Sequence, residues 1–409
     1  MTVTLTPIAE APPSASPRRW LILAVLCASV FVVVLDGTII NVALPTLATE
    51  LGATTSQLQW IVDSYVLVFA GLLMAAGSLG DRVGRKGLMQ IGLALFATFS
   101  ALGALSDSPG ALIGWRAAMG IGAALMFPAT LAILVNVFTA PKERATAIAV
   151  WAATAGLAVA LGPVTGGFLL EHFWWGSVLM INVPVIAVAL VAIALVVPTS
   201  RDTTIQRFDP LGTVLSIAGI GTLVWAVIEG PEHGWTSPSS VIAFGLAALF
   251  VIGFVAWEQR TDHPMLDVSV FSDMRFTAGS IAVTFAFFAL FGFVFVVTQY
   301  FQFVRGYGTL EAGVRTVPFA VFTASTAPMA AKLAERIGTK AVVTGGLVSM
   351  AVGFAIATTT QVDTPYAVIV LTMFFLGAGL GLVQAPATEA IMGSLPPAKA
   401  GVGSAVNDT

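Results

Sequence analysis

Repeated apolar stretches constrain this chain more than any other feature of its sequence. A helix needs roughly 20 predominantly apolar residues to cross the hydrocarbon core of a membrane, and runs of that length follow one another from residue 20 to residue 392. Hydrophobic residues make up 57% of the chain and charged residues only 10%, whereas about a quarter of a soluble domain is charged. The sequence therefore predicts an all-α polytopic membrane protein.

Twelve membrane spans can be drawn along the chain. No small-residue cleavage site follows the first apolar run, so we expect a retained span and not a signal peptide. The predicted limits are 20–45, 57–79, 87–106, 110–138, 145–170, 175–197, 211–229, 239–257, 276–303, 311–334, 341–360 and 365–392.

The placement of the basic residues predicts which side of the membrane each loop faces. With the N-terminus in the cytoplasm, Arg305 and Arg315 fall outside and Arg116 lies within a span. The remaining Lys and Arg fall on the cytoplasmic side, as the positive-inside rule requires: Arg18, Arg19, Arg82, Arg85, Lys86, Lys142, Arg144, Arg201, Arg207, Arg260, Arg275, Lys332, Arg336, Lys340 and Lys399. We therefore expect a multi-pass protein of the cell (inner) membrane with a cytoplasmic N-terminus.

An internal repeat divides the chain. The segment MAAGSLGDRVGRK (74–86) reappears as MAAKLAERIGTK (329–340), and FPATLAI (127–133) reappears as APATEAI (385–391). Both pairs are eight spans apart, so two additional spans separate two related bundles. The predicted domains are a cytoplasmic tail (1–19), a six-span bundle (20–200), a two-span insertion (201–262) and a second bundle (263–409). On this count a thirteenth and a fourteenth span should follow residue 409, so we expect a fragment or a truncated member of its architecture.

The segment GSLGDRVGRKGLM (77–89) joins the second and third spans. Its glycines allow close backbone approach, and its acidic and basic residues can pair with each other or with a helix end; a plain basic loop is the alternative. The segment resembles the signature loop of the major facilitator superfamily, G-x-L-x-D-R-x-G-R-K. The resemblance implies a conformational role for this loop and its second copy, comprising Gly77, Asp81, Arg82, Gly84, Arg85, Lys86, Glu335, Arg336, Gly338 and Lys340.

The fifth span carries the segment ALGPVTGG (160–167). Proline and small residues make a helix that bends and that other helices approach closely, so general helix packing is one explanation. The segment is also similar to the antiporter motif of the superfamily, with Ala158 where the first glycine is usual. That resemblance implies export in exchange for protons. The residues that match the motif are Gly162, Pro163, Gly166 and Gly167.

Arg116 lies inside the fourth span, in GWRAAMGIGAALMFPAT (114–130). A guanidinium at membrane depth is expensive and marks either function or a buried ion pair. The segment resembles the R-x-x-x-G-x-G motif of the superfamily. Neither GIGAAL here nor GAGLGL (377–382) follows a soluble strand, so a dinucleotide-binding loop is excluded.

Four further segments match one family within the superfamily, the fourteen-span drug:proton antiporters of the QacA/EmrB type. They are LDGTIINVALP (35–45), QLQWIVDSYVL (57–67), QRFDPLG (206–212) and RGYGTLEAGVRTVP (305–318). The resemblance implies a major facilitator fold of two helical bundles with a two-span insertion. It also implies efflux of drug- or antibiotic-like organic molecules by alternating access. Protons would be the coupling ion, and a monomer would be the transporting unit.

Asp36, Asp63 and Arg116 fall at matching depth. At 1.5 Å rise per residue, each lies roughly 10 Å below the outer surface. We expect them to form a network, because an unpaired carboxylate in an apolar medium would be neutralised. Burial and a nearby arginine change the proton affinity of a carboxylate in opposite directions, so this site could couple transport to protons. In the alternative interpretation, Asp36 only pairs or caps helices.

Other polar residues in the spans are candidates for contact with a substrate, although each could instead be satisfied within the bundle. They are Asn41, Gln57, Trp60, Tyr65, Gln299, Gln302 and Gln384.

The sequence also excludes several functional classes. A single cysteine, Cys27, permits neither an internal disulfide nor a thiolate metal site. A net charge of −3 gives no reason to expect a nucleic-acid partner. Because no nucleophile–His–acid cluster or metal-ligand set is present, we expect neither an enzyme nor a cofactor. The alternatives to an antiporter are a proton-coupled symporter for a small solute, against which the fifth-span motif argues, and a truncated membrane protein that does not transport.

Overall fold

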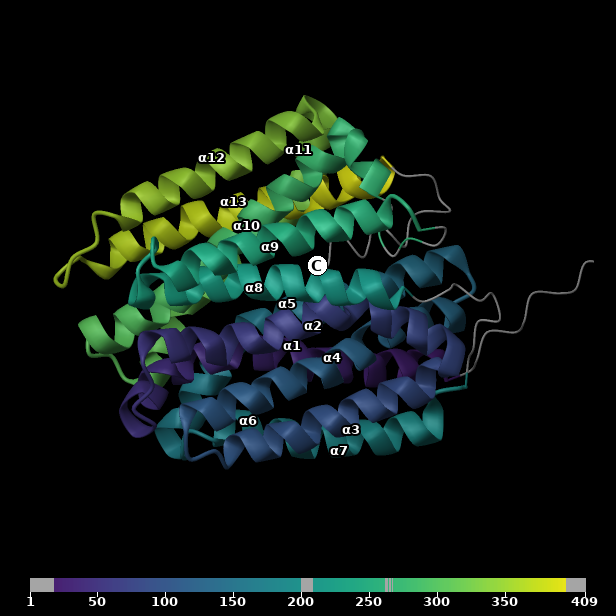
Figure 1. Cartoon of the computed structure of the whole chain (residues 1–409), viewed down its shortest axis with the longest axis horizontal. Coiled ribbons are helices and arrows are strands. Elements are labelled where there is room, and N and C mark those ends of the chain that lie inside the picture. The colour runs from purple at the N-terminus through teal and green to yellow at the C-terminus, as the bar shows by residue number, and fades with distance from the viewer. Residues whose placement is uncertain (1–17, 200–208, 262–263, 265, 267, 395–409) are drawn as a thin grey trace, which may run out of the picture.

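Long helices that lie side by side form this protein (Figure 1). The computed structural model describes residues 18–199, 209–261, 264, 266 and 268–394, and that part of the chain contains helices but no β-strand. The all-α prediction is confirmed. The helices are α1 (Arg19–Glu50), α2 (Thr55–Val83), α3 (Arg85–Ala104), α4 (Pro109–Val137), α5 (Pro141–His172), α6 (Ser177–Met180), α7 (Asn182–Val196), α8 (Pro210–His233), α9 (Pro238–Glu258), η1 (Val268–Ser272), α10 (Met274–Gln299), η2 (Tyr300–Val304), α11 (Thr309–Ile337), α12 (Thr339–Ala357) and α13 (Tyr366–Gly393).

These helices follow the predicted spans closely. Within the described residues, 11 helical segments are long and apolar enough to cross a membrane, with α6 and α7 counted as one segment and α10 and η2 as another. The tenth predicted span, 311–334, is helical as α11 but is less apolar, because Glu311, Arg315 and Lys332 lie in it. α1 continues through Pro45 to Glu50, beyond the predicted end at residue 45.

Helix ends follow from local sequence. Thr54 and Gln57 form a capping box at the start of α2, each side chain accepting a hydrogen bond from the backbone of the other. Gly84 ends α2 at φ 120° and Gly338 ends α11 at φ 88°, a region that glycine enters without steric strain. Each donates its backbone N–H to the carbonyl four residues earlier, at 3.0 Å and 2.9 Å. The two copies of the sequence repeat therefore make equivalent sharp turns.

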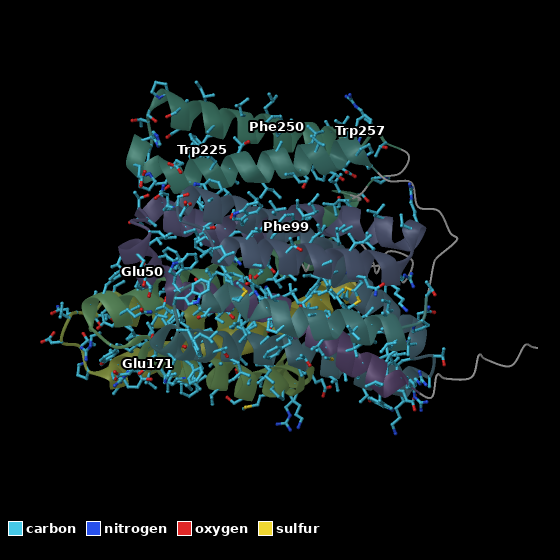
Figure 2. All side chains as sticks on the ribbon, turned by 90° about the horizontal axis from the view of Figure 1, so that it is seen from below. Glu50, Phe99, Glu171, Trp225, Phe250 and Trp257 are labelled. Carbon is cyan, nitrogen blue, oxygen red and sulfur yellow. The ribbon has the colours of Figure 1, made fainter. Side chains whose placement is uncertain are left out.

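Two hydrophobic cores lie in the molecule, one among α1–α7 and one among α10–α13. α8 and α9 form a separate pair (Figure 2), which carries Trp225, Phe250 and Trp257 at one side of the molecule. Within the pair, Trp257 Nε1 donates to Asp209 Oδ1 at 2.9 Å. This arrangement has the form expected of two bundles and an insertion. Residues 200–208 and 262–263, at the predicted boundaries, lie outside the described residues, so the domain limits stay predictions.

Candidate functional site

A fully buried ion pair joins α1 to α4. Arg116 Nη1 donates to Asp36 Oδ2, and both side chains have no exposed area. Arg116 Nε donates to the carbonyl oxygen of Ile61 in α2 at 3.0 Å, and the guanidinium lies 4.5 Å from the centre of the Tyr65 ring. The structure thus brings together two of the three residues that the sequence predicts as a network.

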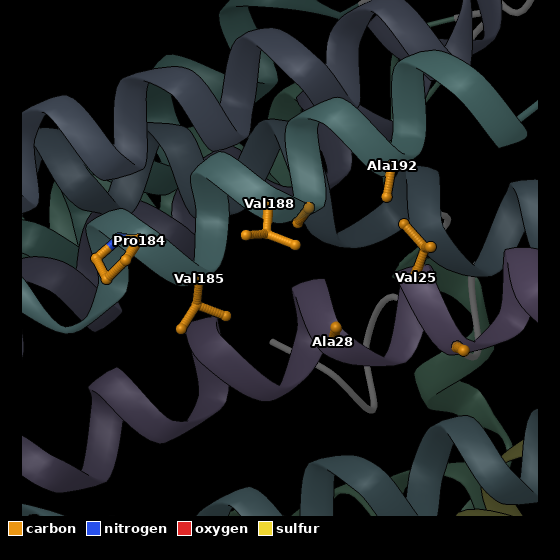
Figure 3. A pocket seen from close by; sticks show the side chains of 8 residues that line it. Val25, Ala28, Pro184, Val185, Val188 and Ala192 are labelled. Carbon is orange, nitrogen blue, oxygen red and sulfur yellow. The ribbon is translucent and has the colours of Figure 1, made fainter.

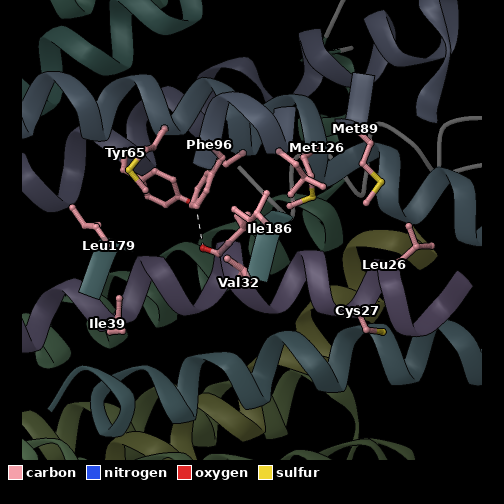
Figure 4. Packing of buried hydrophobic residues seen from close by; sticks show 14 of the residues in the cluster. Leu26, Cys27, Val32, Ile39, Tyr65, Met89, Phe96, Met126, Leu179 and Ile186 are labelled. Atoms are coloured by element: carbon pink, nitrogen blue, oxygen red, sulfur yellow. Dashed lines mark hydrogen bonds between the residues drawn. The ribbon is translucent and has the colours of Figure 1, made fainter. Parts of the chain in front are cut away.

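Apolar side chains of the first core surround this region. Tyr65, Phe96 and Leu179 pack near one another (Figure 4). Tyr65 donates its hydroxyl to the carbonyl oxygen of Val33 at 3.2 Å, so its polar end is satisfied. Charges in an apolar environment interact far more strongly than charges in water. A change in the charge of Asp36 would therefore strongly change its attraction to Arg116.

Asn182 completes the site, and the sequence analysis did not identify it. Its Nδ2 donates to Asp36 Oδ1 at 2.7 Å and to Ser100 Oγ at 3.0 Å. Ser100 in turn donates to the carbonyl oxygen of Leu179 at 2.8 Å. The available signal was a single amide in the apolar run SVLMINVPVIAVAL (177–190). A polar side chain at membrane depth is a functional candidate by the same argument as Arg116.

Asp63 lies apart from this pair. Within the described part of the chain, no hydrogen bond or ion pair joins it to Asp36 or Arg116. Asp63 follows Trp60 by three residues in α2, so the two share a helix face. That face meets α8, where Glu229 Oε1 accepts from Ser56 Oγ and Trp60 Nε1, each at 2.8 Å. The predicted three-residue network is therefore an Asp36–Arg116 pair extended by Asn182, with Asp63 on another face of α2.

Most predicted substrate contacts are hydrogen bonded to nearby backbone. Asn41 Nδ2 donates within α1 to the carbonyl oxygens of Gly37 and Thr38, both at 3.3 Å. Gln299 Nε2 donates within α10 to Phe295 at 3.0 Å. Gln57 belongs to the capping box and Trp60 contacts Glu229, as described above, while Gln384 is exposed on α13. Neither of the two grooves described below is lined by any of these residues, and their predicted role in substrate binding stays a prediction.

A seam between the two cores lies toward the α1–α2 end of the molecule, which we define as the end that holds residues 51–54. Thr298 Oγ1 of α10 lies 3.1 Å from the carbonyl oxygen of Asn41 and also 3.1 Å from that of Val294 in its own helix, so Asn41 and Val294 compete for its single hydrogen. Gln302 Nε2 of η2 donates to the carbonyl oxygen of Val42 at 2.9 Å. Pro45 has no N–H, so the carbonyl of Asn41 lacks its usual partner in α1. The α10 hydroxyl can supply the hydrogen bond that the proline removes when it turns from Val294 to Asn41.

The predicted antiporter motif in α5 lies on the same seam. A side chain at Gly162 or Gly166 would collide with Thr38 or Ile39 of α1. A Cβ at Gly167 would lie 2.5 Å from the carbonyl oxygen of Thr309 in α11, and Gly313 packs directly against the carbonyl of Pro163. Thr309 Oγ1 also donates to the carbonyl oxygen of Gly167 at 3.1 Å. The small residues of the motif therefore let α5 pack tightly between α1 and α11.

The predicted conformational loop lies at the opposite end, which holds Gly84 and which we call the α2–α3 end. Lys86 Nζ donates to the carbonyl oxygen of Ala194, near the end of α7, at 2.9 Å. Arg82 lines a groove of about 320 Å³ between α2 and α4. The side chain of Asp81 lies outside the described part of the structure. Remaining members of the two copies are half-buried or exposed: Gly77, Arg85, Glu335, Arg336 and Lys340.

An apolar groove of about 530 Å³ runs between α1 and α7 (Figure 3). Its lining consists of alanine, valine and proline, including Val25, Pro184 and Val188. None of the predicted site residues lines it, so it supplies no polar group to a substrate.

Comparisons with known proteins identify the architecture. Among solved structures, that of a peptide transporter POT aligns with 98% of this chain and across 89% of its own chain, with a TM-score of 0.70 at 15% sequence identity. The xylose transporter XylE from E. coli aligns with 95% of this chain and across 86% of its own chain, with a TM-score of 0.63 at 18% sequence identity. At such low identity these likenesses establish the fold.

Curated relatives are more similar in sequence. The multidrug efflux pump LfrA of Mycolicibacterium smegmatis is 38% identical over 96% of this chain and 78% of its own length. The methyl viologen resistance protein SmvA of Salmonella typhimurium is 36% identical over 95% of this chain and 79% of its own length. The puromycin resistance protein pur8 of Streptomyces alboniger is 33% identical over 95% of this chain and 78% of its own length.

A family model completes the comparison. The model described as Major Facilitator Superfamily matches residues 26–409. The match agrees with the helical membrane fold, the paired glycine turns and the relatives above. The chain belongs to the Major Facilitator Superfamily, and it is a transporter and not an enzyme.

Proposed function

We propose that this protein is a proton-coupled efflux transporter that exports drug- or antibiotic-like organic molecules by alternating access. The names of its relatives support this substrate class, since they include a multidrug efflux pump and two resistance proteins. The observation that carries the proton coupling is the fully buried pair of Asp36 and Arg116. Ionisable groups inside a membrane are expensive, so a buried pair there marks a proton relay or a substrate pathway.

Proton exchange at Asp36 would change the charge balance of the site. The ionised carboxylate attracts Arg116 and accepts the hydrogen bond of Asn182. Binding of a proton removes that attraction and leaves the guanidinium without a counter-ion in the core. A cationic substrate that competes for the same carboxylate would release the proton. Each ligand would then favour a different conformation, as alternating access requires.

The seam supports a direction for the cycle. We assign the α2–α3 end to the cytoplasm of a cell (inner) membrane protein, because the basic residues concentrate there. The α1–α2 end is then external, and the contacts of Asn41 with Thr298 and of Gly167 with Thr309 close it. Export requires these contacts to open, while the Gly84 and Gly338 turns on the cytoplasmic side rearrange.

The arrangement of the helices supports the fourteen-span QacA/EmrB subtype. The α8–α9 pair lies between the two cores in sequence and forms few contacts beyond α2, as an insertion would. We propose a monomer as the transporting unit, as the resemblance to the superfamily implies. Protons and a small organic molecule would then be its only partners apart from lipid.

The proposed function is tested by transport in proteoliposomes that contain the purified full chain. Under an imposed pH gradient, methyl viologen and puromycin should move against the proton flux, and Asp36→Asn should abolish this movement. Asp363→Asn, in an exposed turn before α13, is the matched control and should transport normally. Full activity of Asp36→Asn would end the proton-carrier assignment. Movement in the same direction as protons would identify a symporter.

A further inference from the structure

Asn182 is a buried polar group that the transport mechanism above does not explain. It begins α7 directly after the short helix α6, and only 1% of its surface is exposed. Ser100 of α3 is also fully buried. Burying an amide or a hydroxyl is unfavourable unless each is hydrogen bonded, so the partners of these two residues indicate what they do.

The direction of every hydrogen bond in this group can be assigned. A serine hydroxyl has one hydrogen, and Ser100 gives it to the carbonyl oxygen of Leu179 at 2.8 Å. Its oxygen can therefore only accept from Asn182, so the NH₂ group of the amide faces Ser100 at 3.0 Å. The second hydrogen of the same nitrogen then faces Asp36 Oδ1 at 2.7 Å. The orientation of an asparagine amide is usually ambiguous, but Ser100 decides it here.

Asp36 consequently faces donors at both oxygens. Asn182 donates to Oδ1 and Arg116 to Oδ2, and a guanidinium offers no acceptor. At these two contacts a protonated Asp36 would meet only donors, so its O–H finds no acceptor there. If the Asn182 amide turns its oxygen toward Asp36, it can accept that O–H, and the turn requires Ser100 to release Leu179.

We propose that Asn182 is a positioning residue for Asp36, oriented by Ser100, and that its amide sets the pH at which Asp36 exchanges its proton. The amide and the hydroxyl form a switch with two hydrogen-bond arrangements, one for the ionised and one for the protonated carboxyl. The link to transport rests on the proposed function, whereas the hydrogen-bond switch is a property of the site alone.

Few other charges influence this switch. Among the described residues, the charged or titratable groups that face Asp36 are Arg116 from α4 and Tyr65 from α2. Other neighbouring helices approach this stretch of α1 through neutral groups: Ser100 from α3, Gly162 and Gly166 from α5, Asn182 from α7 and Thr298 from α10. Two more helices contact α1: α6 has no charged residue, and in α11 Glu311 and Arg315 pair with each other at 2.6 Å. A change in the titration of Asp36 can therefore be attributed to Asn182 when Arg116 and Tyr65 are left intact.

The test is an infrared titration of the full chain in proteoliposomes, which needs no substrate. The carboxyl band that is lost in Asp36→Asn identifies Asp36, and its pH midpoint is compared among variants. In Asn182→Ala the charged form loses one hydrogen bond, so the midpoint should rise by about one pH unit. Ser100→Ala frees the amide to rotate, so a smaller rise in the same direction is expected. Ser29→Ala is the matched control, a buried serine that donates only within α1, to Val25.

An unchanged midpoint in Asn182→Ala would overturn the proposal, as would the absence of a titrating band specific to Asp36. If Asn182→Ala fails to insert, Ser100→Ala carries the test, and a midpoint equal to that of Ser29→Ala overturns it. Transport of methyl viologen by the wild type separates this result from the proposed function. A shifted midpoint without transport would leave the switch standing and reject the efflux assignment.

Discussion

The Thr298 hydroxyl of α10 donates to the carbonyl oxygen of Asn41 in α1 at 3.1 Å. The acceptor is available because Pro45, four residues later, has no N–H to give it. A proline inside the first membrane helix thus creates a docking point for the second half of the protein. Because the hydrogen bond joins the two cores, it would break if the α1–α2 end opened as the proposed cycle requires.

Removing this hydrogen bond should shift the protein toward the conformation that is open at the α1–α2 end. A single hydrogen bond contributes about 1 kcal/mol, and the Thr298 hydroxyl also has an acceptor in Val294 of its own helix. Thr298→Val should therefore change the ratio of open to closed molecules by at most roughly 5-fold. Spin labels at Glu50 and Glu311 would report this as a larger population at long distance. Thr284→Val, which loses only a bond to Ser280 within α10, should leave the distances unchanged. Identical distributions for Thr298→Val and wild type would contradict the seam as a gate.

Gly167→Ala should prevent the seam from closing. The added Cβ would lie 2.5 Å from the carbonyl oxygen of Thr309 and 2.7 Å from the Cα of Leu310, and backbone atoms cannot rotate away. We expect at least a 10-fold loss of transport with normal insertion into the membrane. Gly156→Ala in the same helix meets nothing within 4 Å and should transport as the wild type does. Equal transport by both variants would show that the close approach of α5 and α11 is dispensable.

The sequence predicts the fold better than it predicts the site, for a physical reason. In lipid every backbone polar group needs an internal partner, so apolar runs of sufficient length must be helical. Depth follows from helix rise alone, and Asp36 and Arg116, placed at one depth, do pair. Pairing also depends on which helix faces meet, and those contacts are tertiary. Asp63 has the expected position in α2 but lies on another face, and Asn182 was missed.

The Asp36–Arg116 pair should show strong coupling in stability. Removing one partner of a buried ion pair costs about 3–5 kcal/mol, because the remaining charge is left uncompensated. Arg116→Leu should therefore lower the melting temperature markedly. Adding Asp36→Asn removes the stranded charge, so the double variant should melt at a higher temperature than Arg116→Leu alone. Additive losses in the double variant would mean that the two residues stabilise the protein independently.

Glu229 should hold the α8–α9 pair against α2. Its Oε1 accepts hydrogen bonds from Ser56 and Trp60. Among the described residues the only basic side chain within 4 Å of its carboxylate is His233 of α8 itself, at 3.5 Å. A hydrogen bond to a charged group contributes about 1.5–3 kcal/mol, so Glu229→Ala should lower the melting temperature. Labels placed on α2 and α8 should then give a broader distance distribution.

Glu232→Ala, an exposed position one turn closer to the end of α8, is the control and should change neither quantity. If the pair travels with the first core during transport, the α2–α8 distance in the wild type should also stay constant between open and closed states. A distance that varies with the gate at Thr298 would show instead that the α8–α9 pair moves independently of α2.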